Sequence, residues 1–403
     1  MNASHVTYFS RARHAVSRLL RAGECQKDET VTLPDHHGGN EPVAPGLCSV
    51  AGATIQIIQA AEGLDALEPA CDVLASKSDM PMQDFAWIRS YALTFAGEGE
   101  LHVMVAGETP NITAIAPLVR RRGRPDRLEL LGVNELYEPM DFFGADSSAL
   151  MLLARSLVRS GIPVLLKRVP ANSPLIGVLR HAYRWRGMVF CRPVPACPWI
   201  PLDASWKQPE HQLSHGRRSH LRQARRIAER MGPVTSEVLS PTMNELGPLL
   251  EEAFRVEAAG WKGRCGSAMA HDTLKGAFFR RYAAEACRKK MLRLCFLRIG
   301  GRAAAMQLAV EYRERWWLLK VGYDEAFARC SPGALMLLET VRYAAAHGLR
   351  SYEFLGTVEP WIQMWTKSVR PCVSLAAYPV NAKGLAALGT DSMAMMRKIL
   401  EKR

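Results

Sequence analysis

The chain has 403 residues, of which 48% are hydrophobic, and its formal net charge is +13. This length and composition predict about two globular domains with hydrophobic cores of their own. No apolar run reaches the roughly 18 residues that a membrane span needs, and the basic N-terminus lacks the apolar stretch of a signal peptide, so we expect a cytoplasmic protein.

The first half of the chain alternates helices and strands after a linker. Residues 24–47 are polar and rich in Pro and Gly, which predicts a flexible linker after a short basic segment. The hydrophobic patterns then predict a strand at 53–59, helices at 64–77 and 84–96, strands at 100–107, 111–121 and 127–133, a helix at 147–160, a strand at 163–170, a helix at 173–187 and a strand at 188–194.

The second half repeats this order. The patterns predict helices near 214–231 and 245–258, strands at 291–299, 302–312 and 315–323, a helix at 333–347, a strand at 350–356, a short helix at 358–367, a strand at 372–380 and a C-terminal helix at 383–402. Gly300-Gly301 suits a two-residue hairpin turn. A repeat of element order over comparable lengths indicates a tandem duplication.

The repeat predicts an α/β fold with mixed sheets, divided into two domains of the same kind. We expect a basic N-terminal segment and linker at 1–48, one domain at 49–200, a second domain at 201–382 and a terminal helix at 383–403. The two halves share no obvious residue identity, so this prediction depends on element order alone.

Several stretches of the second half resemble the CelD-type (cellulose-biosynthesis) acyltransferases of the GCN5-related N-acetyltransferase (GNAT) superfamily. They are RRSHLRQARR (217–226), GWKGR (260–264), GRAAAMQLAV (301–310), LKVGYDEAFARCSPGALML (319–337), GLRSYEFLG (348–356) and EPWIQMW (359–365). The first half matches through PMQDFAWIRSY (81–91) and AIAPLV (114–119). Two GNAT-like units in one chain also resemble the Fem-type aminoacyl ligases of peptidoglycan. The resemblance implies an acyl-CoA co-substrate and no metal.

The turn between strand 315–323 and helix 333–347 has a candidate role. In GNAT folds this turn gives backbone N–H groups to the pyrophosphate of an acyl-CoA, and the matching residues here are Arg329, Cys330, Ser331, Gly333 and Ala334. A helix start suits an anion because its N–H groups are unpaired and carry partial positive charge. Gly333 would let the backbone approach a phosphate, and Arg329 would add a charged donor. A purely structural turn is the alternative.

Three residues are candidates for proton transfer, because acyl transfer to an amine needs a base. Asp324 ends the strand beside the turn and is our first choice, although a cap on the following turn explains it equally well. Glu353 lies within a strand, where its side chain needs a partner or a cleft. Tyr323 could protonate a leaving thiolate or simply hydrogen-bond to backbone.

Further residues are candidate contacts for the acceptor or the donor. They are Arg218, Arg222, Arg225, Trp261, Lys262, Gln307, Lys320 and Trp361. The three arginines share one side of a predicted helix, where they either bind an anion or form a solvated charged face. Trp261 could line a pocket or anchor a core. The family often has Tyr-Lys where this chain has Trp361-Ile362, so a lysine that could stabilise an oxyanion is missing.

Charge and cysteine content limit the partners. The net charge of +13 fits an acidic partner such as nucleic acid, a phosphorylated molecule or an anionic surface, and an ordinary basic surface also explains it. The ten cysteines include no C-x-x-C pair, and His36-His37 is isolated, so we expect reduced thiols and no metal site.

The resemblance implies an acyltransferase in which an amine or hydroxyl attacks the thioester directly. The thioester would lie in a split between strands 315–323 and 350–356, and a strand N–H would hold the oxyanion. The acceptor would be an amino sugar, a polysaccharide precursor or an amino acid, and an acyl carrier protein is an alternative donor. Two other hypotheses stay open: a Fem-like transferase that uses charged tRNA, and a non-catalytic accessory protein in exopolysaccharide assembly, which the loss of lysine at Ile362 suggests.

Overall fold

The structure is a computed structural model, and it describes residues 54–401 except 77, 98–99, 261–263, 265 and 267. Three sequence predictions lie outside the described residues: the basic segment and linker at 1–48, Trp261 and Lys262. Both halves of the expected repeat fall within a single contact unit, which spans 52–403.

Strands and helices alternate along the described chain. The strands are β1 (Ile55–Ile58), β2 (Val103–Ala106), β3 (Ala114–Ala116), β4 (Leu118–Arg121), β5 (Arg127–Leu130), β6 (Phe143–Gly144), β7 (Val164–Pro170), β8 (Gly187–Pro201), β9 (Val234–Leu239), β10 (Leu292–Ile299), β11 (Arg302–Tyr312), β12 (Arg315–Tyr323), β13 (Ser351–Glu353) and β14 (Val369–Pro379). The α-helices are α2 (Glu68–Ala75), α3 (Phe85–Phe95), α4 (Val133–Leu136), α5 (Ser147–Ser160), α6 (Leu175–Tyr183), α7 (His215–Met231), α8 (Met243–Ala258), α10 (Thr273–Arg288), α11 (Pro332–Ala346), α12 (Pro360–Gln363) and α13 (Ala382–Leu400). Short 3-10 helices are η1 (Ala61–Leu67), η2 (Pro81–Gln83), η3 (Ala204–Lys207), η4 (Pro209–Gln212) and η5 (Glu325–Cys330).

The strands form two sheets, and the element order of the first half recurs in the second. A four-stranded sheet has the order β1-β2-β3-β6, and a ten-stranded sheet has the order β4-β5-β7-β14-β8-β13-β12-β11-β10-β9. Two parallel pairs, β5 with β7 and β12 with β13, occupy equivalent places in the two halves. A long helix lies between the two strands of each pair, α5 in the first half and α11 in the second, and each pair is followed by another helix and one long strand. The mixed α/β fold with two tandem units is therefore confirmed.

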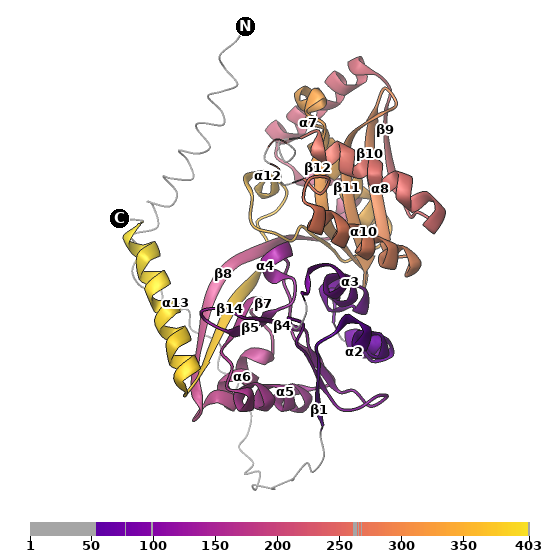
Figure 1. The fold of residues 1–403 in the computed structure, drawn as a ribbon. Coiled ribbons are helices and arrows are strands. Elements are labelled where there is room, and N and C mark those ends of the chain that lie inside the picture. Colours follow the sequence, from indigo (N-terminus) through magenta and orange to yellow (C-terminus); the bar gives the residue numbers. More distant parts are fainter. Residues whose placement is uncertain are drawn as a thin grey trace, which may run out of the picture. The chain divides into compact units, whose positions relative to one another are not determined.

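Each half gives its last strand to the other half. β8 ends the first half, and its residues Trp199–Pro201 pair with β13 of the second half. β14 ends the second half and pairs with β7 of the first half. The two long strands also pair with each other along Gly187–Pro198 of β8, as Figure 1 shows. Main-chain hydrogen bonds therefore connect the two halves.

The structure corrects parts of the predicted element order. The helix pair before the strands of the second half is α8 and α10, whereas the sequence pattern favoured 214–231 and 245–258; the helix at the former range, α7, instead precedes edge strand β9. Neither α10 nor β9 follows from the pattern, and β8 continues to Pro201 instead of ending at 194. The hairpin turn at Gly300-Gly301 is present, with φ of 58° and 78°.

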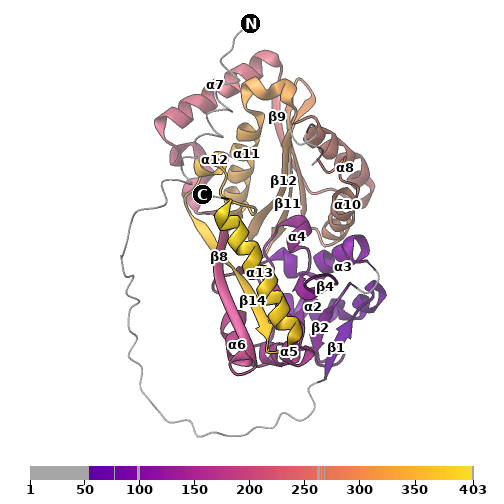
Figure 2. The ribbon, with the colours of Figure 1, turned by 60° about the vertical axis from the view of Figure 1, so that its left-hand side comes forward.

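Helices cover both faces of strands β9 to β12. α8 and α10 pack on one face, where Phe254 and Phe279 are fully or almost fully buried. α7 and α11 pack on the other face through residues such as Leu221 and Leu337. Figure 2 shows α11 and α8 on opposite sides of β11 and β12. Successive residues of a strand point to opposite faces, so each of these strands serves both layers.

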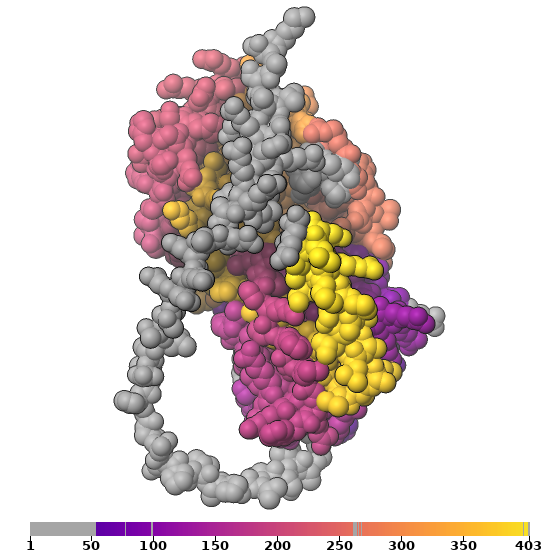
Figure 3. Space-filling model, turned by 90° about the vertical axis from the view of Figure 1, so that its left-hand side faces the viewer, coloured from indigo at the N-terminus to yellow at the C-terminus, as the bar shows by residue number. Residues whose placement is uncertain are grey.

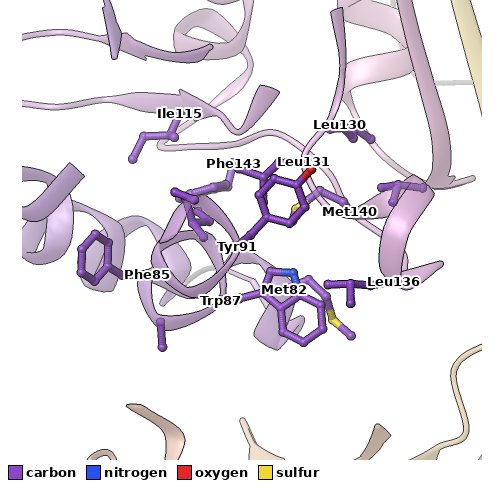
Figure 4. Packing of buried hydrophobic residues seen from close by; sticks show 14 of the residues in the cluster. Met82, Phe85, Trp87, Tyr91, Ile115, Leu130, Leu131, Leu136, Met140 and Phe143 are labelled. Carbon is purple, nitrogen blue, oxygen red and sulfur yellow. The ribbon is translucent and has the colours of Figure 1, made fainter. Parts of the chain in front are cut away.

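The core of the first half is built around α3. Trp87 and Tyr91 are 1% and 0% exposed, and the Trp87 ring meets Phe278 of α10 edge to face at 4.9 Å. Figure 4 shows Leu136 and Met140 near the same two aromatic rings. The core of the first half thus extends to α10. It also holds Leu136, the last residue of α4, and Met140, four residues later.

The C-terminal helix α13 packs along β14, and Figure 3 shows it at the surface in yellow. The Tyr378 hydroxyl donates to Asp391 at 2.7 Å, and Asp391 also pairs with Arg127 of β5 at 3.2 Å. Asn381 caps the helix by accepting the N–H of Gly384 at 2.8 Å. Helix α13 is therefore fixed on β5 and β14.

Gly322 lets α8 approach β12 closely, and this contact predicts a stability effect. A Cβ at Gly322 would lie 2.6 Å from the Cα of Glu257, whereas a Cβ at Gly247 in the same helix meets nothing within 4 Å. We expect Gly322→Ala to lower the free energy of unfolding by about 1–3 kcal/mol because backbone must move. Gly247→Ala should raise it by about 0.5–1 kcal/mol. Urea denaturation of both variants measures this, and equal effects would contradict the packing.

Candidate functional site

Strands β12 and β13 part soon after they pair. Their hydrogen-bonded register covers Arg315–Trp317 and Ser351–Glu353, and β12 then continues to Tyr323 without β13. A bulge lies just beyond the parting, because Ala309 of β11 faces Leu318 and the preceding Leu308 faces Lys320. A bulge bends its strand and increases the local twist. The local geometry therefore opens the sheet at the strand that leads to the predicted turn.

The turn after β12 ends in the N-terminus of α11. Ser331 adopts a left-handed conformation with φ of 46°, and Pro332 occupies the first helical position. The N–H groups of Ala334 and Leu335 donate to the Ser331 carbonyl at 3.0 and 3.2 Å. Within the described part of the chain, the N–H of Gly333 has no hydrogen-bond acceptor. One open N–H group and the positive end of the helix dipole therefore meet at Gly333.

Neither the backbone nor the packing of this turn requires glycine at 333. Gly333 does not have a positive φ, and an added Cβ would meet only the Tyr323 ring, at 3.8 Å. Its neighbours differ in accessibility: the Cys330 side chain is fully buried and donates to the Phe327 carbonyl at 3.0 Å, whereas Arg329 is exposed. The turn thus offers an open position beside a charged side chain.

Asp324 and Tyr323 lie directly before this turn. The Asp324 carboxylate accepts the N–H of Ala326 at 2.9 Å and caps η5, and Arg302 lies 3.3 Å away. Tyr323 is half-buried and packs against the apolar cluster under α11. The capping role of Asp324 is therefore present in the structure, and its use as a base stays a prediction.

Glu353 and Gln307 are buried, and both side chains are hydrogen-bonded. Arg370 donates to Glu353 at 2.8 and 2.6 Å, and Ser351 donates at 2.7 Å. Gln307, 3% exposed, accepts from the Tyr352 hydroxyl at 3.0 Å. Arg370 binds both oxygens of Glu353, so a role for Glu353 as a base would require this pair to open.

The arginines of α7 line a hollow of about 630 Å³ against α11. Arg218, Arg222 and Arg225 come together there with Arg342. Arg225 pairs with Glu339 at 3.5 Å, and Arg342 also contacts Glu339. Acidic partners therefore neutralise part of this surface, while Arg218 and Arg222 have no ion pair among the described residues.

Three other predicted positions are spread around the second half. The Lys320 ammonium lies 4.7 Å from the centre of the Phe279 ring, on the α10 side of the sheet. Trp361 is 42% exposed and meets Phe354 edge to face. Ile362 is 3% exposed in the apolar cluster under α11, so packing explains an apolar residue there.

The segment after α4 holds two buried carboxyl groups that the sequence did not mark as site residues. Glu138 and Asp141 are each 7% exposed. Burial raises the pKa of each to about 7, although Ser173 and the Phe142 N–H donate to Asp141 and oppose the shift. Asp141 lines a second hollow, of about 590 Å³, together with Glu353 and Arg315. In the sequence the two acidic residues are separated only by Pro139 and Met140, a pattern that does not predict their burial.

The described residues contain no group of three or more His, Cys, Asp or Glu side chains that could hold a metal ion. Over the same part of the chain, none of the helices combines the length and the apolar character that crossing a membrane requires.

Comparison with protein families and solved structures places this geometry among known folds. Residues 215–362 match the family model described as acetyltransferase (GNAT) domain. No curated protein matches the chain. The C-terminal domain of an Agrobacterium fabrum protein named as a lysylphosphatidylglycerol synthetase is similar in structure, with a TM-score of 0.52 and 13% identity over 83% of this chain and 96% of that one.

Two further structures are similar over both halves. L-PGS from Bacillus licheniformis has a TM-score of 0.50 and 14% identity, with 81% of this chain and 94% of that one covered. FemX has a TM-score of 0.50 and 12% identity, with coverage of 81% and 98%. At such low identities these likenesses show the fold alone.

The raised pKa of Asp141 predicts a pH effect on stability. A folded-state pKa of about 7 against 3.8 means that the fold favours the protonated carboxyl, so this stabilisation is lost as pH rises through about 7. Relative to wild type, Asp141→Asn should therefore gain about 2–3 kcal/mol of unfolding free energy between about pH 5 and pH 8. Chemical denaturation at several pH values measures the difference.

Asp203→Asn is the matched control for this pH series. Hydrogen bonds from Ser205 lower the pKa of Asp203, so its carboxyl is ionised throughout the same pH range in both folded and unfolded chains. Its difference from wild type should stay constant. If the unfolding free energies of Asp141→Asn and wild type change in parallel with pH, burial does not raise the pKa of Asp141 and the prediction is wrong.

Proposed function

We propose that the chain is an acyltransferase of the GNAT kind, because residues 215–362 match the GNAT acetyltransferase domain model, and that its donor is an acyl-CoA bound across the end of β12. The diphosphate would lie at the start of α11, and the thioester would enter where β12 and β13 part. The acceptor would be an amine or hydroxyl of an amino sugar, a polysaccharide precursor or an amino acid. We also propose that the enzyme is of the CelD type, which its sequence resembles.

The observation that carries the proposal is the open position at Gly333. Its N–H lacks an acceptor in the described structure, and the space around it leaves room for a ligand atom. A helix N-terminus favours an anion because the dipole and the unpaired N–H act together. Ser331, Ala334 and the exposed Arg329 surround the same point, whereas the buried Cys330 side chain holds the turn from inside.

The parting of β12 and β13 supports the position of the thioester. An extended acyl-CoA arm needs a slot with unpaired main chain beside it, and strands that pair over three residues and then separate offer such a slot. A donor N–H on β12 would stabilise the oxyanion as the carbonyl becomes tetrahedral. β12 ends at Tyr323, which remains a candidate proton donor to the leaving thiolate, and the next residue, Asp324, remains a candidate base.

A Fem-like transferase that uses charged tRNA is the second candidate. Arg218 and Arg222 support it, because they lack ion pairs in the described structure and line a hollow large enough for a phosphate-bearing group. The accessory-protein hypothesis loses its main support, since Ile362 fills an apolar core position. A cytoplasmic location and the domain boundaries at 200 and 382 also stay predictions.

Gly333→Val tests the donor site. The valine side chain would occupy the open position and cover the N–H, so we expect the dissociation constant for CoA to rise at least about tenfold, or about 1.4 kcal/mol. Gly177→Val in α6 is the control, because a Cβ there meets nothing within 4 Å and no predicted site residue is near in sequence. Isothermal titration with CoA measures both. Unchanged CoA affinity in Gly333→Val would show that the turn is purely structural.

Charge reversal on α7 separates the two candidate donors. We expect CoA affinity to change less than about threefold when Arg218→Glu and Arg222→Glu are combined. Both side chains lie on α7, and solvent and salt screen much of the effect of their charge on the turn. For a tRNA donor the same variant should bind charged tRNA more weakly and with a smaller salt dependence. Fluorescence titrations at two salt concentrations measure both affinities. If the wild-type protein binds charged tRNA but not CoA, and the variant loses tRNA binding, the Fem-like enzyme is favoured.

A further inference from the structure

A cluster of ionisable groups surrounds the chain just after β13. Arg168 of β7, 1% exposed, donates to the Gly356 carbonyl at 2.6 Å and to the Cys197 sulfur at 2.8 Å. The Gly356 N–H faces the carboxylate of Glu138. Lys320 of β12 also lies close enough to Glu138 to lower its pKa. First-half and second-half residues therefore meet where β12 and β13 part.

Glu138 differs from the other acidic residues of the region. Its Oε2 atom is buried and has no hydrogen-bond partner among the described residues. Glu353 has both oxygens bound by Arg370, and Asp324 caps a helix. Burying a carboxyl oxygen without a hydrogen-bond partner costs free energy. Such an atom therefore indicates a role in binding a ligand or in transferring a proton.

The segment that carries Glu138 is held rigidly. Leu136 and Met140, on either side, are 5% and 1% exposed, and Figure 4 shows both in the core near Trp87 and Tyr91. The Arg168 guanidinium lies 4.2 Å from the centre of the Tyr137 ring. The backbone that carries Glu138 is thus held in place by the packing of Leu136, Tyr137 and Met140, and a catalytic group requires such support.

Its position suits the acceptor side of the proposed reaction. Lys320 points to the α10 face of the sheet, since its ammonium lies over Phe279. The start of α11, where the diphosphate would bind, belongs to the opposite face. Glu138 lies near Lys320 and accepts from the Gly356 N–H, so its carboxyl group is close to the place where β12 and β13 part.

We propose that Glu138, in place of Asp324, is the general base that accepts the proton of the attacking amine or hydroxyl, an assignment that depends on the acyl-CoA function proposed above. The acceptor nitrogen or oxygen attacks the thioester carbonyl carbon, and its proton passes to the Glu138 carboxylate. The new C–N or C–O bond forms as the C–S bond breaks. The proton then passes from Glu138 to the CoA thiolate, which leaves as the thiol.

The electrostatic surroundings suit this role. Burial raises the pKa of Glu138 to about 7, and Lys320, Arg168 and the Gly356 N–H oppose this shift. The Cys197 thiol belongs to the same cluster, because its sulfur accepts from Arg168 at 2.8 Å. A base with a pKa near the working pH is half ionised and returns its proton readily. The rate of transfer should therefore rise with pH through about 7 and level off above it.

The test measures CoA binding and CoA release separately. Acetyl-CoA is the donor, and water and glucosamine are the acceptor probes, with release of the thiol followed by a colour reagent between about pH 5.5 and 9. Glu138→Gln keeps the shape of the side chain and removes the base. We expect its acetyl-CoA dissociation constant to stay within about twofold and its rate of CoA release to fall at least about 100-fold, without the inflection near pH 7.

Glu129→Gln is the control for loss of a buried carboxylate. Glu129 is also 7% exposed in the first half, but it pairs with Arg127 at 3.3 Å. It should lose stability and keep the wild-type rate and pH profile. Wild-type rates in Glu138→Gln, or wild-type protein that binds acetyl-CoA and releases no thiol with either probe, overturn the assignment of Glu138. Wild-type protein that does not bind acetyl-CoA instead overturns the donor proposed above.

Discussion

The exchange of the last strands is the constraint on which the rest of the structure depends. Because β8 leaves the first half to pair with β13, and β14 returns to pair with β7, neither half completes its sheet alone. The main-chain hydrogen bonds of these pairs fix β13, and β13 in turn determines where β12 loses its neighbour. The same exchange places Arg168 of β7 against the end of β13. The candidate site is therefore assembled from both halves.

The sequence was most informative where hydrophobic periodicity was clear. The helix predicted at 147–160 is present as α5 with the same limits, and strands 302–312 and 315–323 match β11 and β12. The α10 helix was missed because Phe278, Phe279 and Tyr282 are mixed with basic residues along it. β8 was cut short because prolines usually end strands. Up to Pro198, β8 pairs with β14 alone, so a proline nitrogen, which has no N–H to donate, can face the unpaired side of the strand.

The site was predictable only in part, and the reason is topological. The turn at 329–334 follows a strand and starts a helix, so its chemistry can be proposed from local sequence. Glu138, by contrast, owes its environment to Arg168, Lys320 and Gly356, which lie far from it along the chain. No pattern in one sequence indicates that β8 and β14 exchange places, and without that exchange these residues would not meet. The same holds for Glu353, whose burial within a strand is explained by its ion pair with Arg370 of β14, a partner that the sequence pattern does not reveal.

Hydrogen exchange with and without CoA, followed by mass spectrometry, tests the central claim most directly. A diphosphate at the start of α11 and an acyl arm in the parting of the strands would protect amides in two separate segments. The account predicts slower exchange with CoA in peptides that cover 331–337 and 316–323, and no change in α13. Protection confined to α7 and η4, or no protection anywhere, would contradict it.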